Sequence, residues 1–288
     1  IVITAGATEA LFAALFTILN PGDEVIVPTP AFVLYEQIIG LCRGKFVPLD
    51  TAPSQFQIDP QALAACITPK TRAIILNSPN NPTGCVYNAA SLRAVYEAVR
   101  GRDIFVVCDD VYRQLIYTDT YHSFAEFRDL RSQLLIVQSF SKPYAMTGWR
   151  VGYLLADAPV KQQLEKVHQY NVVSISSFVQ QACVQALQYD ISADLALYRR
   201  RRDYVCARLD KMGLPYFKPQ GAFYVFPSIA PPGMDSLTFC TRMVREGKLA
   251  CTPGSCFGAE GYFRISYCYS DEVLREGMDR LERFLQTL

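Results

Sequence analysis

The chain has 288 residues, half of them hydrophobic, which is enough for one large domain or for a large and a small one. Its formal net charge is +1, so no overall field attracts nucleic acid or a membrane surface, and we expect neither as a partner. The longest apolar stretch, residues 10–19, is too short to cross a bilayer. Any bound phosphate therefore has to be held by a local site.

The ten cysteines and two histidines argue against disulfides and metal binding. No C-x-x-C pair or zinc-ligand spacing occurs, and neither His122 nor His168 has a ligand partner nearby in the sequence. We predict free thiols, a cytoplasmic location and no metal site. The chain starts at Ile1, within a pattern and without a methionine, and no signal peptide is visible. We expect the natural N-terminus to lie upstream.

The first two-thirds of the chain alternates short β-rich runs with helical patterns. Strands are predicted at 25–27, 45–49, 73–76, 104–108, 134–137 and 151–155, and helices at 8–19, 32–41, 60–65 and 89–100. Several of the runs are continuously apolar, as buried parallel strands are. The alternation predicts an α/β fold with a mostly parallel central sheet between layers of helices.

The pattern changes towards the C-terminus. Residues 160–189 read as a long helix broken near 172–174, and the arginine run 199–202 opens a charged helix. Because aspartates surround this run, we interpret it as a solvated helix face. Short strands follow at 216–217, 223–226 and 263–267, before a final helix at 271–285. We predict a large domain at 1–190 and a smaller α+β domain at 191–288.

Polar clusters follow three of the predicted strands, at 77–84, 109–112 and 139–142. Open α/β sheets bind their ligands outside the carboxyl ends of the strands, so we expect these clusters to share one cleft.

Lys142 is the main candidate for chemistry in this cleft. It follows the apolar run 134–137, lies near Ser139 and Ser141, and precedes Arg150 by eight residues. A lysine amine can form a Schiff base with an aldehyde, while hydroxyls and a guanidinium can hold a phosphate dianion. Pyridoxal 5'-phosphate (PLP) is therefore the leading cofactor hypothesis. The alternative is a solvated loop lysine.

Two further segments fit such a cofactor. The small residues before Thr8 leave amides free at a helix start, which suits an anion, although Thr4 or Thr8 could instead cap an ordinary helix. Asp109 ends the most apolar strand, where a carboxylate needs a positive partner such as a protonated pyridine nitrogen. We interpret Asp110 as a solvated loop carboxylate.

Together these motifs resemble those of the class I/II PLP-dependent aminotransferases of fold type I, in the branch with aspartate, aromatic and kynurenine enzymes. G-A-T-E-A-L, N-x-P-N-N-P-T-G, D-x-x-Y and S-x-x-K followed by T-G-W-R occur in the family's order along essentially the whole chain. The segments 221–224 and 252–255 also resemble motifs that border the substrate cleft.

The resemblance implies a role for each candidate residue. Lys142 would carry the cofactor and move the proton between Cα and C4', Asp109 would pair with the ring nitrogen, and Phe32 would stack on the ring. Tyr35 is interpreted as packing. Tyr112 and Asn81 would bind the phenolic oxygen, with Asn81 also bordering the substrate. The expected phosphate ligands are Ala7, Thr8, Ser139 and Arg150. Arg264 would bind the substrate α-carboxylate, unless it is a strand-surface arginine in a salt bridge.

The resemblance implies ping-pong transamination between an α-amino acid and a 2-oxo acid, and a homodimer. It also implies an N-terminal arm that is not in this sequence. Two alternatives use the same scaffold: a PLP-dependent carbon–sulfur β-lyase, and the effector domain of a transcription regulator.

Overall fold

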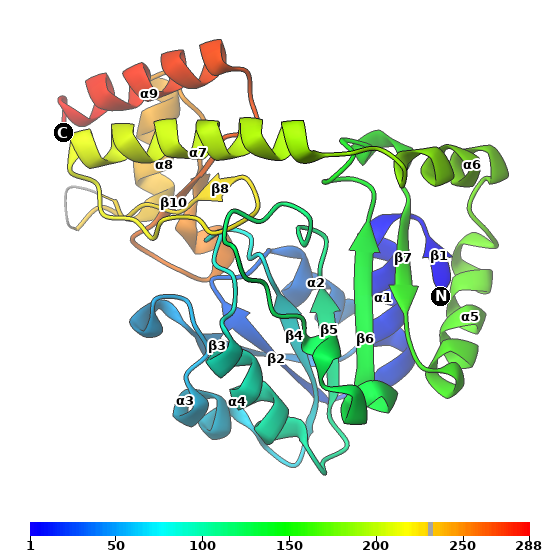
Figure 1. The fold of residues 1–288 in the computed structure, drawn as a ribbon. Helices are drawn as coiled ribbons and strands as arrows, with labels where there is room; N and C mark the ends of the chain where they lie inside the picture. Colours follow the sequence, from blue (N-terminus) through cyan, green and yellow to red (C-terminus); the bar gives the residue numbers. More distant parts are fainter. Residues whose placement is uncertain (230–232) are drawn as a thin grey trace.

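The computed structural model describes residues 1–229 and 233–288. The larger sheet of this part of the chain has seven strands and lies between helices (Figure 1). The strands follow the order β1-β7-β6-β5-β4-β2-β3. Strands β2 to β6 are parallel, whereas β7 is antiparallel to both β6 and β1. The bounds are Val2–Thr4 (β1), Glu24–Thr29 (β2), Lys45–Asp50 (β3), Thr71–Asn77 (β4), Phe105–Asp109 (β5), Leu134–Ser139 (β6) and Gly152–Leu155 (β7). The predicted α/β class with a mostly parallel sheet is confirmed, and β1 is an addition to it.

Helices cover both faces of this sheet, because successive side chains of a strand point to opposite sides. Ile75 and Val107 pack in the cluster beneath α1 (Gly6–Ile18), α2 (Leu34–Leu41) and α5 (Ala158–Val172). Their neighbours Ile74 and Val106 pack with α3 (Pro60–Cys66) and α4 (Ala89–Val99) on the other face. The predicted sandwich of helices is therefore present.

Helix α7 (Ser192–Met212) connects the larger sheet to the C-terminal part of the chain (Figure 1). The predicted break lies between α5 and α6 (Ser177–Ala186), where Val173 has a φ of 66°. The solvated-face interpretation of the arginine run is wrong for Arg202. This side chain is only 9% exposed, and its guanidinium lies 4.7 Å from the centroid of the Tyr117 ring.

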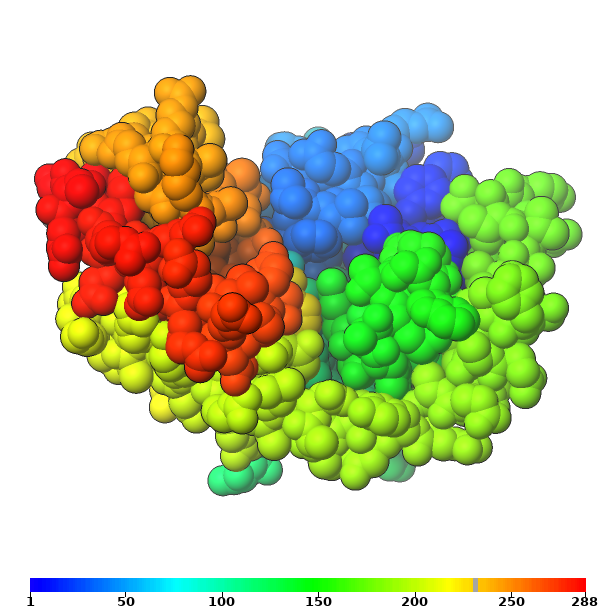
Figure 2. Space-filling model, turned by 90° about the horizontal axis from the view of Figure 1, so that it is seen from above, coloured from blue at the N-terminus to red at the C-terminus, as the bar shows by residue number. Residues whose placement is uncertain are grey.

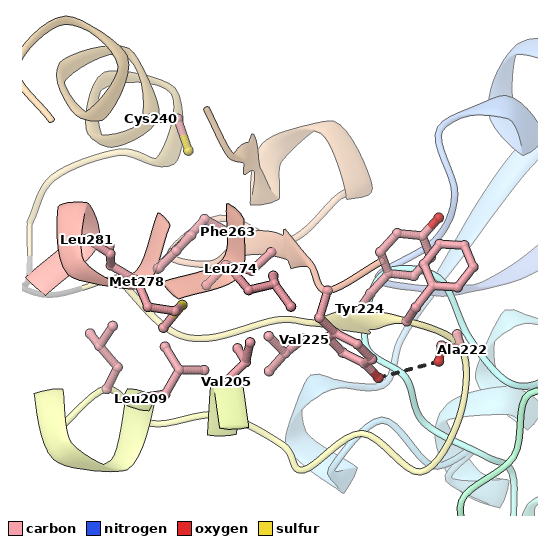
Figure 3. Packing of buried hydrophobic residues seen from close by; sticks show 14 of the residues in the cluster. Val205, Leu209, Ala222, Tyr224, Val225, Cys240, Phe263, Leu274, Met278 and Leu281 are labelled. Carbon is pink, nitrogen blue, oxygen red and sulfur yellow. Dashed lines mark hydrogen bonds between the residues drawn. The ribbon is translucent and has the colours of Figure 1, made fainter. Parts of the chain in front are cut away.

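The C-terminal part contains a three-stranded antiparallel sheet with α7, α8 (Ser236–Arg245) and α9 (Asp271–Leu285) packed around it. Its strands are β8 (Tyr224–Val225), β9 (Thr252–Pro253) and β10 (Phe263–Ser266), in the order β8-β10-β9. Leu209, Phe263 and Leu281 lie in one buried cluster that joins these elements (Figure 3). The strand predicted at 216–217 is only an isolated bridge between Tyr216 and Pro227, and α8 was not predicted.

A hollow separates the orange and red C-terminal residues from the blue and green N-terminal ones in the space-filling view (Figure 2). The carboxyl ends of β4, β5 and β6 point towards it (Figure 1). Within the described ranges, none of the helices is both long and apolar enough to cross a membrane.

Candidate active site

A cavity of about 220 Å³ lies at the carboxyl ends of β4, β5 and β6. Residues from both parts of the chain line it. All ten residues named from the sequence are among them: Ala7, Thr8, Phe32, Asn81, Asp109, Tyr112, Ser139, Lys142, Arg150 and Arg264. The three polar clusters predicted to share one cleft also meet here, through Asn77, Asp109 and Ser139.

Lys142 projects into this cavity from the loop after β6 and is half-buried. Its Nζ lies 5.9 Å from the centroid of the Tyr112 ring and 5.8 Å from that of Phe223. Burial lowers the pKa of the amine, and the charges of Arg264 and Arg150 act in the same direction, against those of Cys268 and Asp109. A larger share of the amine is therefore neutral and nucleophilic near pH 7 than for a solvated lysine.

Asp109 offers one unsatisfied oxygen to the same cavity. Its Oδ2 accepts a hydrogen bond of 2.6 Å from the Tyr35 hydroxyl, while the buried Oδ1 has no partner among the described residues. Burial raises the pKa of this carboxyl to about 6, against the Tyr35 hydroxyl, the Val111 amide and the Lys142 charge. A buried acceptor without a partner is costly, so a donor in the cavity would be bound strongly.

Of two sequence interpretations next to Asp109, that of Tyr35 as packing is confirmed and that of Asp110 as solvated is wrong. Tyr35 does pack in the core, with 2% exposure, but its hydroxyl also holds the Asp109 carboxylate. Asp110 is 6% exposed and not a solvated loop residue. Its amide bonds to Val137 of β6, so the chain continues along the sheet for one more residue and carries this side chain inside. Burial and the neighbouring Asp109 raise the pKa of Asp110 to about 7, against the effect of Arg113.

The start of α1 forms an anion cradle at the other end of the cavity. Neither Thr4 nor Thr8 caps the helix: the Thr4 hydroxyl donates to the Gly6 carbonyl, and the N-cap residue Ala5 has no side-chain cap bond. The first amides of a helix have no acceptor within it, so those of Ala7 and Thr8 remain for a ligand. The alternative of an ordinary capped helix is therefore wrong.

Arg150 and Ser139 complete this cradle. The Arg150 guanidinium lies against the first turn of α1, since a Cβ added to Gly6 would be 2.6 Å from its Nη2. Its Nη1 donates to the Thr147 carbonyl over 2.9 Å. The buried Ser139 hydroxyl accepts from the Ser141 amide at 3.0 Å, at the edge of the same cavity.

Arg264 lies on β10, on the opposite wall. Its Nη1 donates to Asn81 Oδ1 at 2.8 Å, and its guanidinium carbon is 4.4 Å from the centroid of the Tyr224 ring. Among the carboxylates of the described residues, none is within ion-pair distance of Arg264, which argues against the salt-bridge alternative. The guanidinium is thus available to an anionic ligand.

Comparison with known proteins identifies the family of this chain. The family model of "Aminotransferase class I and II" matches residues 1–281. The chain belongs to the class I and II aminotransferase family. Like the members it resembles, it is a PLP-dependent aminotransferase, and it matches them in both sequence and fold.

The aminotransferase relatives include a Bacillus subtilis protein named "Probable N-acetyl-LL-diaminopimelate aminotransferase". It is 41% identical, over 99% of this chain and 73% of its own length. The crystal structure of aspartate aminotransferase from Thermotoga maritima superposes with a TM-score of 0.95 at 36% identity, over 99% of this chain and 75% of that one. An aromatic aminotransferase from Pyrococcus horikoshii gives a TM-score of 0.95 at 39% identity, over 99% and 79%.

The aminotransferase cavity fits PLP. The unpartnered Oδ1 of Asp109 suits a protonated ring nitrogen, the α1 start with Arg150 suits a phosphate, and Lys142 supplies an amine. When bound, PLP withdraws electrons from the substrate Cα and so weakens its bond to hydrogen.

Eight cavity residues were not named individually as functional from the sequence; those with a hydroxyl are Tyr35, Ser141, Thr147 and Tyr224. Ser141 stands in the S-x-x-K motif and Tyr224 in the 221–224 motif, so their positions carried a signal. Tyr35 lies three residues beyond Phe32, one helical turn, and this spacing could have placed its hydroxyl in the site.

Proposed function

We propose that Lys142, Asp109 and Tyr112 form the catalytic group of this aminotransferase and that the α1 start anchors the cofactor phosphate. One observation carries the proposal: Asp109 Oδ1 is buried without a partner in the same cavity that holds the Lys142 amine. Asp109 would keep the cofactor ring nitrogen protonated. The amides of Ala7 and Thr8, the Ser139 hydroxyl and the Arg150 guanidinium would hold the phosphate.

Lys142 would bind the cofactor aldehyde and then move the proton between Cα and C4'. The lowered pKa of its amine supports this role, because a base must be neutral to accept a proton. Phe32, half-buried and perpendicular to the Tyr35 ring at 6.0 Å between centroids, would cover the ring of the cofactor. Tyr112 and Asn81 would bind the phenolic oxygen.

We propose α-amino acids and 2-oxo acids as substrates, held at the α-carboxylate by Arg264. A guanidinium matches a carboxylate with two parallel hydrogen bonds. Arg264 is already oriented by Asn81 and by the Tyr224 ring, so little side-chain entropy would be lost on binding. The relatives are named for aspartate, aromatic and N-acetyl-diaminopimelate substrates. These substrates share a carboxylate, and Arg264 supports binding of that group.

A homodimer and a cytoplasmic location complete the proposal. The dimer rests on the family resemblance and on the exposed apolar side chains of α5 and α6. The location rests on ten free cysteines, as expected in a reducing compartment. The relatives described above are all named as aminotransferases, which favours transamination over the carbon–sulfur lyase and over a regulatory domain.

The test is to identify the lysine that carries PLP. Borohydride reduction of the PLP-loaded protein, followed by peptide mapping, should label Lys142, and a panel of amino acids should bleach the visible band. Lys142→Ala should lose turnover but keep some PLP, because the phosphate cradle is intact. The exposed Lys70→Ala is the matched control and should behave as wild type. Label on another lysine, or full turnover in Lys142→Ala, would contradict the proposal.

A further inference from the structure

Two side-chain hydrogen bonds join N-terminal and C-terminal residues that line the active-site cavity. One joins Arg264 to Asn81, and the other joins the hydroxyls of Tyr224 and Tyr112 at 3.0 Å. Tyr224 lies on β8, at the end of the C-terminal core cluster that faces the N-terminal segments (Figure 3). It is 6% exposed and lines the active-site cavity.

The Tyr224 side chain contacts two residues with separate proposed roles. Its ring lies under the Arg264 guanidinium, 4.4 Å from the guanidinium carbon. The same ring meets that of Tyr112 edge to face, with centroids 5.8 Å apart and planes at 82°. One residue thus connects the proposed carboxylate ligand to the proposed ligand of the cofactor's phenolic oxygen.

The number of hydroxyl protons decides the direction of the hydrogen bond between the tyrosines. A tyrosine hydroxyl has one proton to donate and can also accept. If Tyr112 gives its proton to the cofactor's phenolic oxygen, the bond at 3.0 Å requires Tyr224 to donate to Tyr112. A hydroxyl that accepts a hydrogen bond becomes a stronger donor, since such chains polarise one another.

We propose that Tyr224 is a positioning residue with two functions: its hydroxyl strengthens the hydrogen bond from Tyr112 to the cofactor, and its ring holds Arg264 for the substrate carboxylate. This inference rests on the proposed function, in particular on the role of Tyr112. It makes the electronic state of the cofactor depend on a side chain of the C-terminal part.

Other ionisable groups surround this pair and enter any pH measurement. They are Arg264, Cys268 and Tyr269 near Tyr224, and Asp109 and Lys142 near Tyr112. None of them is altered in the variants below, so their effects are common to all of the proteins compared.

The first experiment is a spectral pH titration of the PLP-loaded protein. A donor to the phenolic oxygen stabilises the deprotonated form of the bound cofactor, so losing it raises the pH midpoint of the visible band. Tyr224→Phe should raise the midpoint by about half to one pH unit, the equivalent of one hydrogen bond. Tyr112→Phe should raise it by at least as much. The double variant should match Tyr112→Phe alone, because Tyr224 acts through Tyr112.

The second experiment separates the ring from the hydroxyl. Tyr224→Phe keeps the ring and should change KM less than twofold for both substrates. Tyr224→Leu also removes the cation–π contact and should raise both KM values about three- to tenfold. Tyr204→Phe is the control: its hydroxyl accepts from Arg208 on α7, outside the cavity, and it should shift neither midpoint nor KM. Melting of the cofactor-free variants reports any general loss of stability.

The outcomes distinguish the inference from the proposed function. If Tyr112→Phe shifts the midpoint and Tyr224→Phe does not, or if the two shifts add in the double variant, the coupling is refuted and the role of Tyr112 stands. If Tyr112→Phe causes no shift, the proposed role of Tyr112 fails and the inference fails with it. Equal KM values for Tyr224→Phe and Tyr224→Leu would refute the role of the ring.

Discussion

The buried Asp109 carboxylate lowers the stability of the cofactor-free protein at high pH, although we propose that catalysis needs it. Burial raises the pKa of its carboxyl from an ordinary value of 3.8 to about 6, so the folded cofactor-free protein binds the proton more tightly than the unfolded chain does. The stability that this proton supplies is present at low pH and is lost as the pH rises from about 4 to 6. The loss amounts to up to about 3 kcal/mol at pH 8.

Asp109→Asn should therefore stabilise the cofactor-free protein and inactivate the enzyme. Urea unfolding at pH 8 should give a free energy about 1–3 kcal/mol above that of wild type, with a smaller difference at pH 5. Turnover with PLP should fall at least about a hundredfold, because the ring nitrogen loses its charged partner. The exposed Asp119→Asn should change neither quantity. An Asp109→Asn protein that is less stable at pH 8 would contradict the burial argument.

We propose that Tyr35 keeps the Asp109 carboxyl ionised through the hydrogen bond from its hydroxyl. This hydrogen bond lowers the pKa of Asp109 against the larger effect of burial, so Tyr35→Phe should raise it further. The cofactor then meets a carboxyl that is protonated more often at pH 6 than at pH 8. We expect PLP affinity to fall roughly tenfold at pH 6 and less at pH 8, measured by fluorescence titration. An equal loss at both pH values would mean that Tyr35 acts by packing alone.

The sequence predicted which residues line this site better than it predicted the hydrogen bonds between them. Asp109 and Lys142 follow apolar strands and were placed in one cleft by that position. Tyr35 was interpreted as packing because a helix pattern shows that a side chain is buried but not which atom its hydroxyl meets. Asp110 was misplaced for a related reason: a polar residue at a strand end can lie inside or outside, and only the hydrogen bond to Val137 decides.

At the scale of elements, the phosphate cradle depends on close backbone packing between β7, β6 and α1. A Cβ added to Gly152 would lie 2.6 Å from the Gln138 carbonyl oxygen and 3.0 Å from the Ala7 amide nitrogen. Both are backbone atoms, so they can yield only if the strand or the helix start moves. A glycine at the start of β7 thus allows the α1 amides to approach the site.

Gly152→Ala should weaken PLP binding together with fold stability. We expect a loss of about 1–3 kcal/mol in unfolding free energy, as for other overpacked sites, and a PLP Kd raised at least about tenfold. Gly148→Ala is the matched control, since nothing lies within 4 Å of its added Cβ. Pyridoxal, which lacks the phosphate, should lose less affinity than PLP. Equal losses for the two ligands would place the damage outside the phosphate cradle.

The elements that the sequence predicted well are those with their own pattern. The buried strands β4, β5 and β6 and the amphipathic α9 were found within one residue of their bounds, apart from the start of β4 and the end of β6, which differ by two residues. By contrast, β8 and β9 have two residues each, too few for any alternation to show. They exist because β10 pairs with both, a tertiary condition that no local pattern contains.

At the scale of the whole molecule, the largest exposed apolar side chains concentrate on α5 and α6 and the turn between them. Tyr170 is 89% exposed, Val173 76% and Phe178 75%, and Val184 and Leu187 lie close in sequence. Exposed large apolar side chains gathered on neighbouring elements are typical of an interaction surface. The proposed homodimer therefore has a candidate contact surface at the end of the molecule that carries α6 (Figure 1).

Charges placed on this surface should dissociate the dimer. In analytical ultracentrifugation, wild type should sediment as a dimer with twice the chain mass of 32.3 kDa. Phe178→Asp should sediment as a monomer, because an unpaired carboxylate buried at an interface costs several kcal/mol. Leu237→Asp on α8 is the matched control: Leu237 is 62% exposed but far along the chain, in the C-terminal part, and its variant should remain dimeric. A wild type that stays monomeric at tens of micromolar would refute the dimer, and a dimeric Phe178→Asp would place the contact elsewhere.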